Sequence, residues 1–213
     1  MPSPEPDIGA TAKALADRIE ALPRHDGRRL IAIAGAPASG KSLLSGVLAT
    51  TLTHRGRTAR VIPMDGFHLD NKVLTARGLL PRKGAPETFD AHGFIALIKR
   101  IKRGGEVIYP EFDRSRDLAI AGAAVLDADC DTAIIEGNYL LFDEPPWSEL
   151  KPLWDLSVWI DTPMEVIRAR CIQRWLDHGH SQQDAEKRAE GNDLRNAKRI
   201  AGAQLPADMV LRE

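Results

Sequence analysis

Four residues in the first quarter of the chain, Gly35, Gly40, Lys41 and Ser42, have the types and the spacing of a phosphate-binding loop. They fit the pattern G-x-x-x-x-G-K-[ST]. The two glycines permit backbone angles and close approaches that a Cβ would forbid, so successive N–H groups can curl around phosphate oxygens. The lysine ammonium would reach the outer phosphates, and the serine hydroxyl would hold Mg²⁺. The motif therefore predicts binding of a nucleoside triphosphate.

The residues on either side of this loop agree with the motif. The apolar run from Leu30 to Ala34 predicts a buried strand, and apolar residues at helical spacing from Leu43 to Leu52 predict a helix. The alternative is an ordinary glycine-containing turn, but four specified positions with the correct flanks argue against it. The residues expected to contact ATP in this region are Gly35, Ala36, Pro37, Ala38, Ser39, Gly40, Lys41, Ser42 and Leu43.

Two acidic residues follow predicted strands further along the chain. Asp65 comes directly after a predicted strand at 59–64, and Glu136 closes another at 132–136. In open α/β sheets, ligands gather at the carboxyl ends of the strands. We therefore expect Asp65 beside the reactive phosphate and Glu136 in the Mg²⁺ shell. The alternatives are a carboxylate that caps the next turn and a strand-end carboxylate with no metal role.

Residues 66–90 have no clear periodicity, and a loop of this length inside a compact domain is usually functional or disordered. Its apolar side chains argue against disorder, so we interpret it as part of an acceptor site. Arg82 and Lys83 are candidates to bind an anion there, with solvated surface charge as an equal alternative. His68 lies close to Asp65 and could touch a substrate, although we favour a role in the turn or the core.

A later helix carries two arginines that could close over a triphosphate. Thr162-Pro163-Met164-Glu165 predicts its start, with a threonine N-cap, a proline at the first helical position and a capping-box glutamate. Arg170 and Arg174 are four residues apart and share one face of this helix. Paired arginines on a lid can neutralise charge during phosphoryl transfer. A solvated basic face is the alternative.

The composition is ordinary for a globular protein, with 43% hydrophobic and 28% charged residues. A net charge of −1 gives no reason to expect a nucleic-acid partner, and no apolar run is long enough for membrane insertion. The first residues lack the basic-then-apolar order of a signal peptide. Cys130 and Cys171 have no metal-binding or C-x-x-C spacing, which suits a reducing compartment. We therefore expect a cytoplasmic location.

Predicted strands and helices alternate along the chain, and the phosphate-binding loop follows the first strand. This order predicts an α/β fold, a P-loop NTPase three-layer sandwich with a mostly parallel central sheet, helices on both faces and a small helical lid. We expect residues 1–213 to form a single domain. Within it, residues 66–90 and 106–126 would be acceptor-site insertions, and residues 168–199 would be the lid region.

Other classes of P-loop protein fit the sequence less well. A GTPase would carry an Asn-Lys-x-Asp signature, which Asn71-Lys72-Val73-Leu74 fails. A motor or AAA-type ATPase would usually end a strand in Asp-Glu, where this chain has Glu136-Gly137. Phosphoryl transfer to a bound hydroxyl fits better, because Asp65 and residues 66–90 supply a base and an acceptor site.

Four further stretches carry a resemblance to a known group. They are MDGFHL at 64–69, RKGAPETFD at 82–90, YPEFDRSRD at 109–117 and IIEGNYLL at 134–141. Together with GAPASGKS, the chain resembles the uridine kinase, phosphoribulokinase and bacterial pantothenate kinase superfamily. Within it, the chain is most similar to the branch often labelled fructose-transport-system kinase or nucleoside/nucleotide kinase-like. The resemblance covers nearly everything from Leu30 to Ile200 and implies a P-loop kinase.

The resemblance also implies roles for particular positions. Asp65 would accept the proton of the acceptor hydroxyl, and Glu136 would support the metal or its water. One of the two lid arginines would contact the transferring phosphate. Segments that line the acceptor pocket in relatives correspond here to Tyr109, Asp113 and Arg114. Positions that contact or cover the adenine in relatives correspond to Asn192, Asp193 and Arg195.

The acceptor segments depart from both better-known patterns. Uridine kinases usually have His-Pro-Asp before Phe-Asp, where this chain has Gly84-Ala85-Pro86-Glu87-Thr88. Pantothenate kinases normally have His-Leu ahead of Tyr-Asp, where Pro110-Glu111 stands here. The sequence thus predicts transfer of the γ-phosphoryl group from ATP, with Mg²⁺, to a small-molecule alcohol: a sugar such as fructose, a nucleoside or a pantothenate-like compound. The alternative is a nucleotide-switched regulatory ATPase tied to a sugar transporter. A monomer and a homodimer both stay open.

Overall fold

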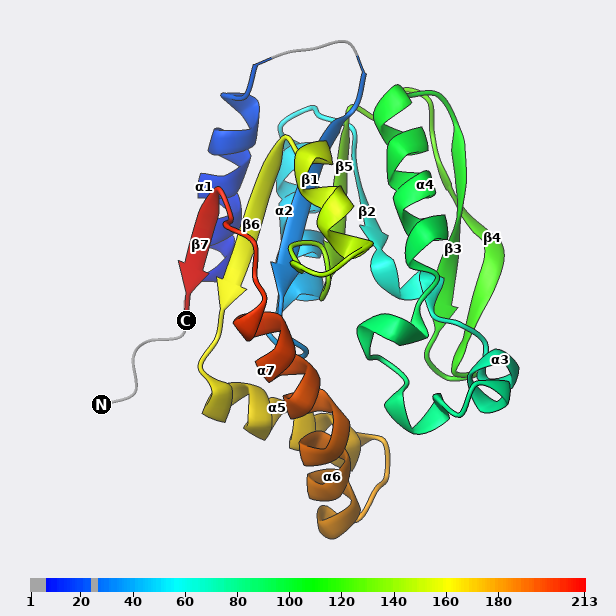
Figure 1. Ribbon diagram of the computed structural model, residues 1–213. Coiled ribbons are helices and arrows are strands. Elements are labelled where there is room, and N and C mark those ends of the chain that lie inside the picture. Colours follow the sequence, from blue (N-terminus) through cyan, green and yellow to red (C-terminus); the bar gives the residue numbers. More distant parts are fainter. Residues whose placement is uncertain (1–6, 24–26) are drawn as a thin grey trace.

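The central sheet of the protein is parallel throughout and has five strands in the order β2–β5–β1–β6–β7 (Figure 1). The computed structural model describes residues 7–23 and 27–213, so residues 1–6 and 24–26 of the expected domain lie outside it. The strands are β1 (Arg29–Gly35), β2 (Ala59–Pro63), β5 (Thr132–Gly137), β6 (Leu156–Asp161) and β7 (Met209–Arg212). The α/β fold with a mostly parallel sheet is confirmed.

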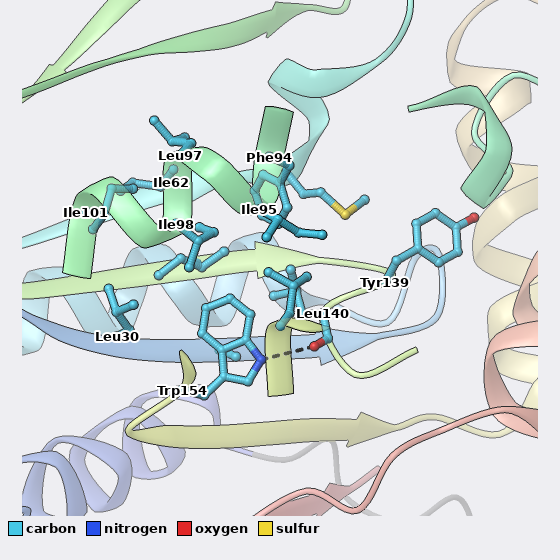
Figure 2. Packing of buried hydrophobic residues seen from close by; sticks show 14 of the residues in the cluster. Leu30, Ile62, Phe94, Ile95, Leu97, Ile98, Ile101, Tyr139, Leu140 and Trp154 are labelled. Carbon is cyan, nitrogen blue, oxygen red and sulfur yellow. Dashed lines mark hydrogen bonds between the residues drawn. The ribbon is translucent and has the colours of Figure 1, made fainter. Parts of the chain in front are cut away.

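Side chains of β1 alternate between the two faces of the sheet, as strand geometry requires. Ile31 and Ile33 pack with α1 (Ile8–Glu20) and α2 (Lys41–His54). On the opposite face, Leu30, Ala32 and Ala34 pack in one cluster with α4 (Ala91–Arg103). Figure 2 shows this second cluster, in which Trp154 donates a hydrogen bond to the Leu140 carbonyl at 3.0 Å. Because helices cover both faces, the polar groups of the sheet concentrate at its ends.

The expected hairpin forms a separate two-stranded sheet of β3 (Val107–Asp113) and β4 (Leu118–Leu126). It lies beside the turn that follows β2, and Gly66 makes that approach possible. A Cβ on Gly66 would come within 2.3 Å of the Pro110 carbonyl oxygen, which belongs to backbone and cannot move aside cheaply. The hairpin is therefore held against the residues that follow Asp65.

Residues 66–90 contain more regular structure than the sequence pattern predicts. Asp70 caps the short helix α3 (Asn71–Ala76) by accepting from the Lys72 N–H at 2.8 Å. The rest of this stretch contains three 3₁₀ turns, at Met64–Phe67, Leu80–Arg82 and Pro86–Thr88. Turns this short bury only a few apolar residues each, which is why they leave no periodic pattern.

Three helices lie beyond the carboxyl ends of β1 and β6 (Figure 1). They are α5 (Met164–Asp177), α6 (Gln182–Arg188) and α7 (Leu194–Gly202), and a π-helical turn over Ala189–Asp193 joins the last two. The predicted N-cap of α5 is wrong. The residue that precedes the helix is Pro163, and the Thr162 hydroxyl is buried without a hydrogen-bond partner. Among the described residues, no helix is long and apolar enough to cross a membrane.

Candidate functional site

The phosphate-binding loop connects β1 to α2, as the motif predicts. Gly35 ends β1, and a Cβ there would lie 2.6 Å from the Ser39 hydroxyl and 3.1 Å from the Ile160 carbonyl oxygen, so a glycine fits this close approach best. Gly40 precedes α2 with a φ of +85°, and Ala38 has a φ of +60°. These left-handed residues turn backbone N–H groups toward the inside of the loop at the positive end of a helix. The geometry is that of an anion cradle.

Lys41 lies inside this cradle and is only 7% exposed. Its Nζ donates to the Ala36 carbonyl at 2.7 Å and lies 3.5 Å from the Ser39 hydroxyl. Burial lowers the pKa of Lys41 to about 8, although the nearby charges of Glu136 and Asp65 act in the opposite direction. A buried ammonium with few partners gains strongly from an incoming anion.

The register of the sheet brings Glu136 and Asp65 to the same edge. Glu136 is the Cα partner of Ile33 on one side and of Pro63 on the other, so it lies between the phosphate-binding loop and the start of the Asp65 turn. It is 8% exposed, and burial raises the pKa of its carboxyl, opposed by the charge of Lys41 and by a hydrogen bond from Ser42. This arrangement places two carboxylates near one ammonium at the carboxyl end of the sheet.

Asp65 is joined to the turn of the β3–β4 hairpin. The Arg114 guanidinium donates to Asp65 Oδ2 at 2.6 Å, with 65% of the arginine side chain exposed and 22% of the aspartate. Asp113, next to it, accepts from the Ser115 hydroxyl at 2.6 Å and from the Arg116 N–H at 3.0 Å. Asp113 thus shapes the hairpin turn, and Arg114 is the residue that faces Asp65.

Two residues that the sequence predicts to contact the acceptor, His68 and Tyr109, have partners within the protein. The His68 ring lies between the rings of Phe89 and Phe112, and its Nδ1 lies 2.8 Å from the Asp65 carbonyl. Burial lowers the pKa of His68, which favours the neutral ring. Tyr109 is 3% exposed and its hydroxyl lies 3.5 Å from the Val61 carbonyl. Both side chains support the site from the core.

Arg82 and Lys83 have partners within the protein. The Arg82 guanidinium donates to the side-chain oxygens of Asn192 at 3.1 Å and Asn196 at 3.3 Å, and Asn192 in turn donates to the Lys83 carbonyl at 2.7 Å. The Lys83 ammonium pairs with Asp117 at 2.8 Å. We call the contacts between residues 82–83 and 192–196 the clasp. The clasp joins the acceptor segment, residues 66–90, to the lid region.

The two lid arginines have different surroundings. Arg174 pairs with Asp193 at 3.0 Å, and its charge contributes to the environment of Lys41, whose pKa it lowers in addition to the larger effect of burial. Arg170 forms a two-pronged ion pair with Glu213, the residue that follows β7. Arg174 also lies about two helical turns after Ile167, which packs in one cluster with Ala36 of the loop, so Arg174 is on the side of α5 that packs against the loop.

Among the other predicted ATP contacts, Leu43 is exposed on the first turn of α2 and Arg195 is exposed on α7. Sequence reasoning missed the contribution of Trp175 and Tyr139. Trp175 donates to Asp193 at 2.8 Å, and the Tyr139 hydroxyl donates to the Gly84 carbonyl at 2.5 Å. Both contacts join different segments of the chain, so no local sequence motif predicts them.

A surface cavity of about 460 Å³ is lined in part by the acceptor segment. Its lining includes Phe89, Phe142, Trp147 and Arg199, and no residue of the phosphate-binding loop. The three aromatic side chains are at most 6% exposed, and Arg199 is paired with Glu144 at 2.6 Å. The cavity is thus separate from the phosphate-binding loop and Lys41.

Comparison with known proteins identifies relatives along nearly the whole chain. The pattern of the Phosphoribulokinase / Uridine kinase family matches residues 30–190. A Schizosaccharomyces pombe protein named "putative uridine kinase" is 33% identical over 98% of this chain and 92% of its own length. A Yersinia pestis pantothenate kinase is 31% identical over 71% of this chain and 52% of its own length. The crystal structure of a "putative fructose transport system kinase" from Silicibacter sp. TM1040 is 54% identical, with a TM-score of 0.90 over 96% of this chain and 98% of that one.

Proposed function

This chain belongs to the phosphoribulokinase / uridine kinase family, and we propose that it phosphorylates a hydroxyl of a sugar, with fructose as the first acceptor to test. The protein is an ATP-dependent kinase of a small molecule. The sugar is supported by the name of the solved relative at 54% identity. A nucleoside and a pantothenate-like alcohol are the other acceptors in the same class, supported by the names of more distant relatives.

The observation that carries this proposal is the meeting of three charged groups at one edge of the sheet. Lys41 is buried in the phosphate-binding loop, and the charges of Glu136 and Asp65 both act on its ammonium. A kinase needs a cation for the transferred phosphate and a carboxylate for the acceptor hydroxyl, side by side. The arrangement supports assigning these roles to Lys41 and Asp65.

In the proposed reaction, Asp65 orients the acceptor hydroxyl and accepts its proton. The hydroxyl oxygen forms a bond to the γ-phosphorus while the bond to the bridging β–γ oxygen breaks, and that oxygen leaves with ADP. Lys41 neutralises the growing charge on the phosphate oxygens, and Arg174 approaches them from the lid. Burial of Lys41 strengthens this electrostatic effect, because water screens a buried charge weakly.

Mg²⁺ fits the residues at this edge. The Ser42 hydroxyl acts on the buried Glu136 carboxylate and lowers its pKa, opposite to the larger effect of burial, so two oxygens of the type that Mg²⁺ prefers lie near each other. We propose that Ser42 binds the ion directly and that Glu136 holds the ion or its water. When bound, Mg²⁺ would neutralise charge on the β- and γ-phosphates.

The direct test is a screen for acceptor-stimulated release of ADP. The protein is incubated with MgATP and, in separate reactions, with fructose, other sugars, nucleosides and pantothenate. Strong stimulation by fructose or another sugar supports the proposal. Stimulation by a nucleoside or by pantothenate alone would contradict the proposed sugar acceptor and would support kinase activity toward another acceptor. Slow ATP hydrolysis that no alcohol stimulates would contradict the proposed transfer and favour the regulatory ATPase.

The role of Asp65 is tested with Asp65→Asn, which keeps the shape of the side chain and removes its ability to take a proton. We expect turnover to fall by about a factor of 100 or more while the dissociation constant for MgATP stays within about threefold. Asp161→Asn is the matched control, because Asp161 also ends a strand of the sheet but is exposed on the surface. Normal turnover of Asp65→Asn would refute the assignment of the base.

A further inference from the structure

The helical segment at the end of the lid, which consists of α6 and α7, contains an irregular turn where the two helices meet. Between α6 and α7, residues Ala189–Asp193 form a π-helical turn. An added residue in a helix shifts every following side chain around the axis, and such turns are rare and found mostly at functional sites. Here the turn buries Asp193, which is 8% exposed, against α5. A carboxylate is expensive to bury, so its partners need an explanation.

Both partners of Asp193 come from α5. Its Oδ2 accepts from the Trp175 indole N–H at 2.8 Å and lies 3.0 Å from Arg174 Nη2. The Arg174 guanidinium also lies over the Trp175 ring, 5.6 Å from its centre. The Arg174 guanidinium is thus held by the Asp193 carboxylate at one edge and by the face of the Trp175 ring. A guanidinium has five N–H donors, so a single carboxylate oxygen leaves others for a phosphate.

The same turn contains a second ion pair to α5 that serves as a comparison. Glu190 pairs with Arg168 at 2.7 Å, but the two side chains are 56% and 46% exposed. Arg174 lies about two helical turns after Ile167, which packs in one cluster with Ala36 of the phosphate-binding loop, and its charge acts on Lys41. The Arg168–Glu190 pair is therefore exposed to solvent, whereas the Arg174–Asp193 pair has a buried carboxylate and an arginine on the side of α5 that packs against the loop.

We propose that Asp193 is a positioning residue, which fixes the guanidinium of Arg174 in the direction of the γ-phosphate of ATP. This inference rests on the proposed function, in which Arg174 contacts that phosphate. Without a partner, the arginine side chain would lose rotamer freedom when the nucleotide binds, which weakens binding. The contact with Asp193 orders the side chain before the nucleotide binds and so reduces this cost. The π-helical turn is the feature that aims Asp193 at α5.

The readout is the preference of the protein for a triphosphate over a diphosphate. Calorimetry gives the dissociation constants of the magnesium complexes of ADP and of the non-hydrolysable analogue AMP-PNP, for the wild type and for Asp193→Asn. Both nucleotides use the phosphate-binding loop, but only AMP-PNP carries the γ-phosphate. We expect Asp193→Asn to lower the preference for AMP-PNP about tenfold, and the binding of ADP to change by less than about twofold. A purely structural loss in the lid would weaken both nucleotides alike.

Further variants make the result decisive. Glu190→Gln removes the exposed pair of the same turn, and it should leave the preference unchanged. Arg174→Ala should lower the preference at least as much as Asp193→Asn, and adding Asp193→Asn to Arg174→Ala should have no further effect, because the carboxylate would have nothing left to position. If Asp193→Asn does not fold, Asp193→Glu takes its place, because it moves the carboxylate by one methylene and should also lower the preference. Trp175→Phe is a further control. It removes the indole donor but leaves Asp193 beside Arg174, so the preference should be kept.

The outcomes that overturn the inference are distinct from those that overturn the proposed function. An unchanged or increased preference in Asp193→Asn, together with a loss in Arg174→Ala, would show that Asp193 does not position Arg174 and would leave the proposed function standing. Equal losses of the preference in Glu190→Gln and Asp193→Asn would show that both residues act only through the stability of the lid. A loss of preference in Trp175→Phe would assign the effect to the indole contact. No loss in Arg174→Ala would refute the role of Arg174 itself.

Discussion

The carboxylate of Asp65 and the guanidinium of Arg114 form an ion pair of 2.6 Å between the turn after β2 and the turn of the β3–β4 hairpin. The two residues are 49 positions apart in the chain. The arginine side chain is 65% exposed, so the pair lies at the surface and its contribution to folding stability is small. Its importance lies in where it holds the proposed base.

The first prediction concerns this pair. In Arg114→Ala, Asp65 loses the partner that fixes its carboxylate, and we expect kcat/KM for the acceptor to fall about tenfold to a hundredfold. The dissociation constant for MgATP should stay within about twofold, because the phosphate-binding loop is untouched. Steady-state kinetics with the acceptor found in the screen would measure both. Arg116→Ala, an equally exposed residue of the same turn, is the control. An equal loss in both variants would indicate damage to the hairpin.

The second prediction concerns pH and Lys41. Burial lowers the pKa of Lys41 to about 8, so the nucleotide-free protein loses the ammonium as the pH rises through about 8. Of the two protonation states of Lys41, only the ammonium attracts phosphate, and a phosphate in turn raises the pKa of the lysine it contacts. Calorimetry should therefore show that the affinity for MgADP is constant below about pH 7 and falls up to tenfold per pH unit well above 8. Lys41→Ala should bind weakly at every pH. A flat profile in the wild type up to about pH 9.5 would contradict the prediction.

The third prediction concerns the clasp and separates two roles for Asn192. The family resemblance implies contact with adenine, whereas Asn192 donates to the Lys83 carbonyl and accepts from Arg82. If the clasp is its main role, Asn192→Ala should raise KM for the acceptor about fivefold, the effect of losing about 1 kcal/mol. The affinity for MgATP should be unchanged. A loss of MgATP affinity with an unchanged acceptor KM would instead support the adenine contact.

The sequence predicts the nucleotide side of the site well because its signals are local. The glycines, Lys41 and Ser42 occupy consecutive positions between a strand and a helix, and their roles depend on that short stretch alone. Asp65 and Glu136 are far apart in sequence, yet strand ends in a parallel sheet share one edge, so their proximity also follows from the pattern. The registers of β2 and β1 against β5 confirm it.

The acceptor side is harder to predict, because its contacts depend on packing between distant segments. The sequence pattern allows Tyr109 to face either the acceptor or the core. The structure buries it in the core, where the hairpin approaches the Asp65 turn. Asp193 depends on a π-helical turn, which no spacing rule for an α-helix anticipates. Arg170 and Arg174 share a helix face as predicted, but their partners come from different parts of the chain.

The fourth prediction separates those two arginines. Arg174→Ala should lower turnover by about a factor of 100 or more, since removing a charge that stabilises the transition state typically costs this much. Arg170 is 38% exposed and paired with Glu213, so Arg170→Ala should change turnover less than about fivefold and stability by about 1 kcal/mol or less. Turnover and thermal unfolding of both variants would test this. Equal losses of turnover in the two variants would indicate that Arg170 also contacts the transferred phosphate.

The fifth prediction concerns stability, at the opposite end of the sheet. Arg28 is 2% exposed and its guanidinium donates to four backbone carbonyls. The acceptors are Cys130 at 2.7 Å, Ile101 at 3.3 Å, Gly105 at 3.0 Å and Asp127 at 2.7 Å. One side chain thus joins the start of β1 to the end of α4 and to the segment before β5. No neighbouring residue can replace a planar group with five donors.

Arg28→Ala would leave these carbonyls without their donor and open a cavity around them. We expect the free energy of unfolding to fall by about 3 to 5 kcal/mol, measured by urea denaturation. Arg28→Lys should recover only part of the loss, because an ammonium cannot reach four carbonyls in that geometry. Arg103→Ala, at the exposed end of α4, is the control and should cost less than about 0.5 kcal/mol. A loss below about 1 kcal/mol in Arg28→Ala would mean that water satisfies the carbonyls in its place.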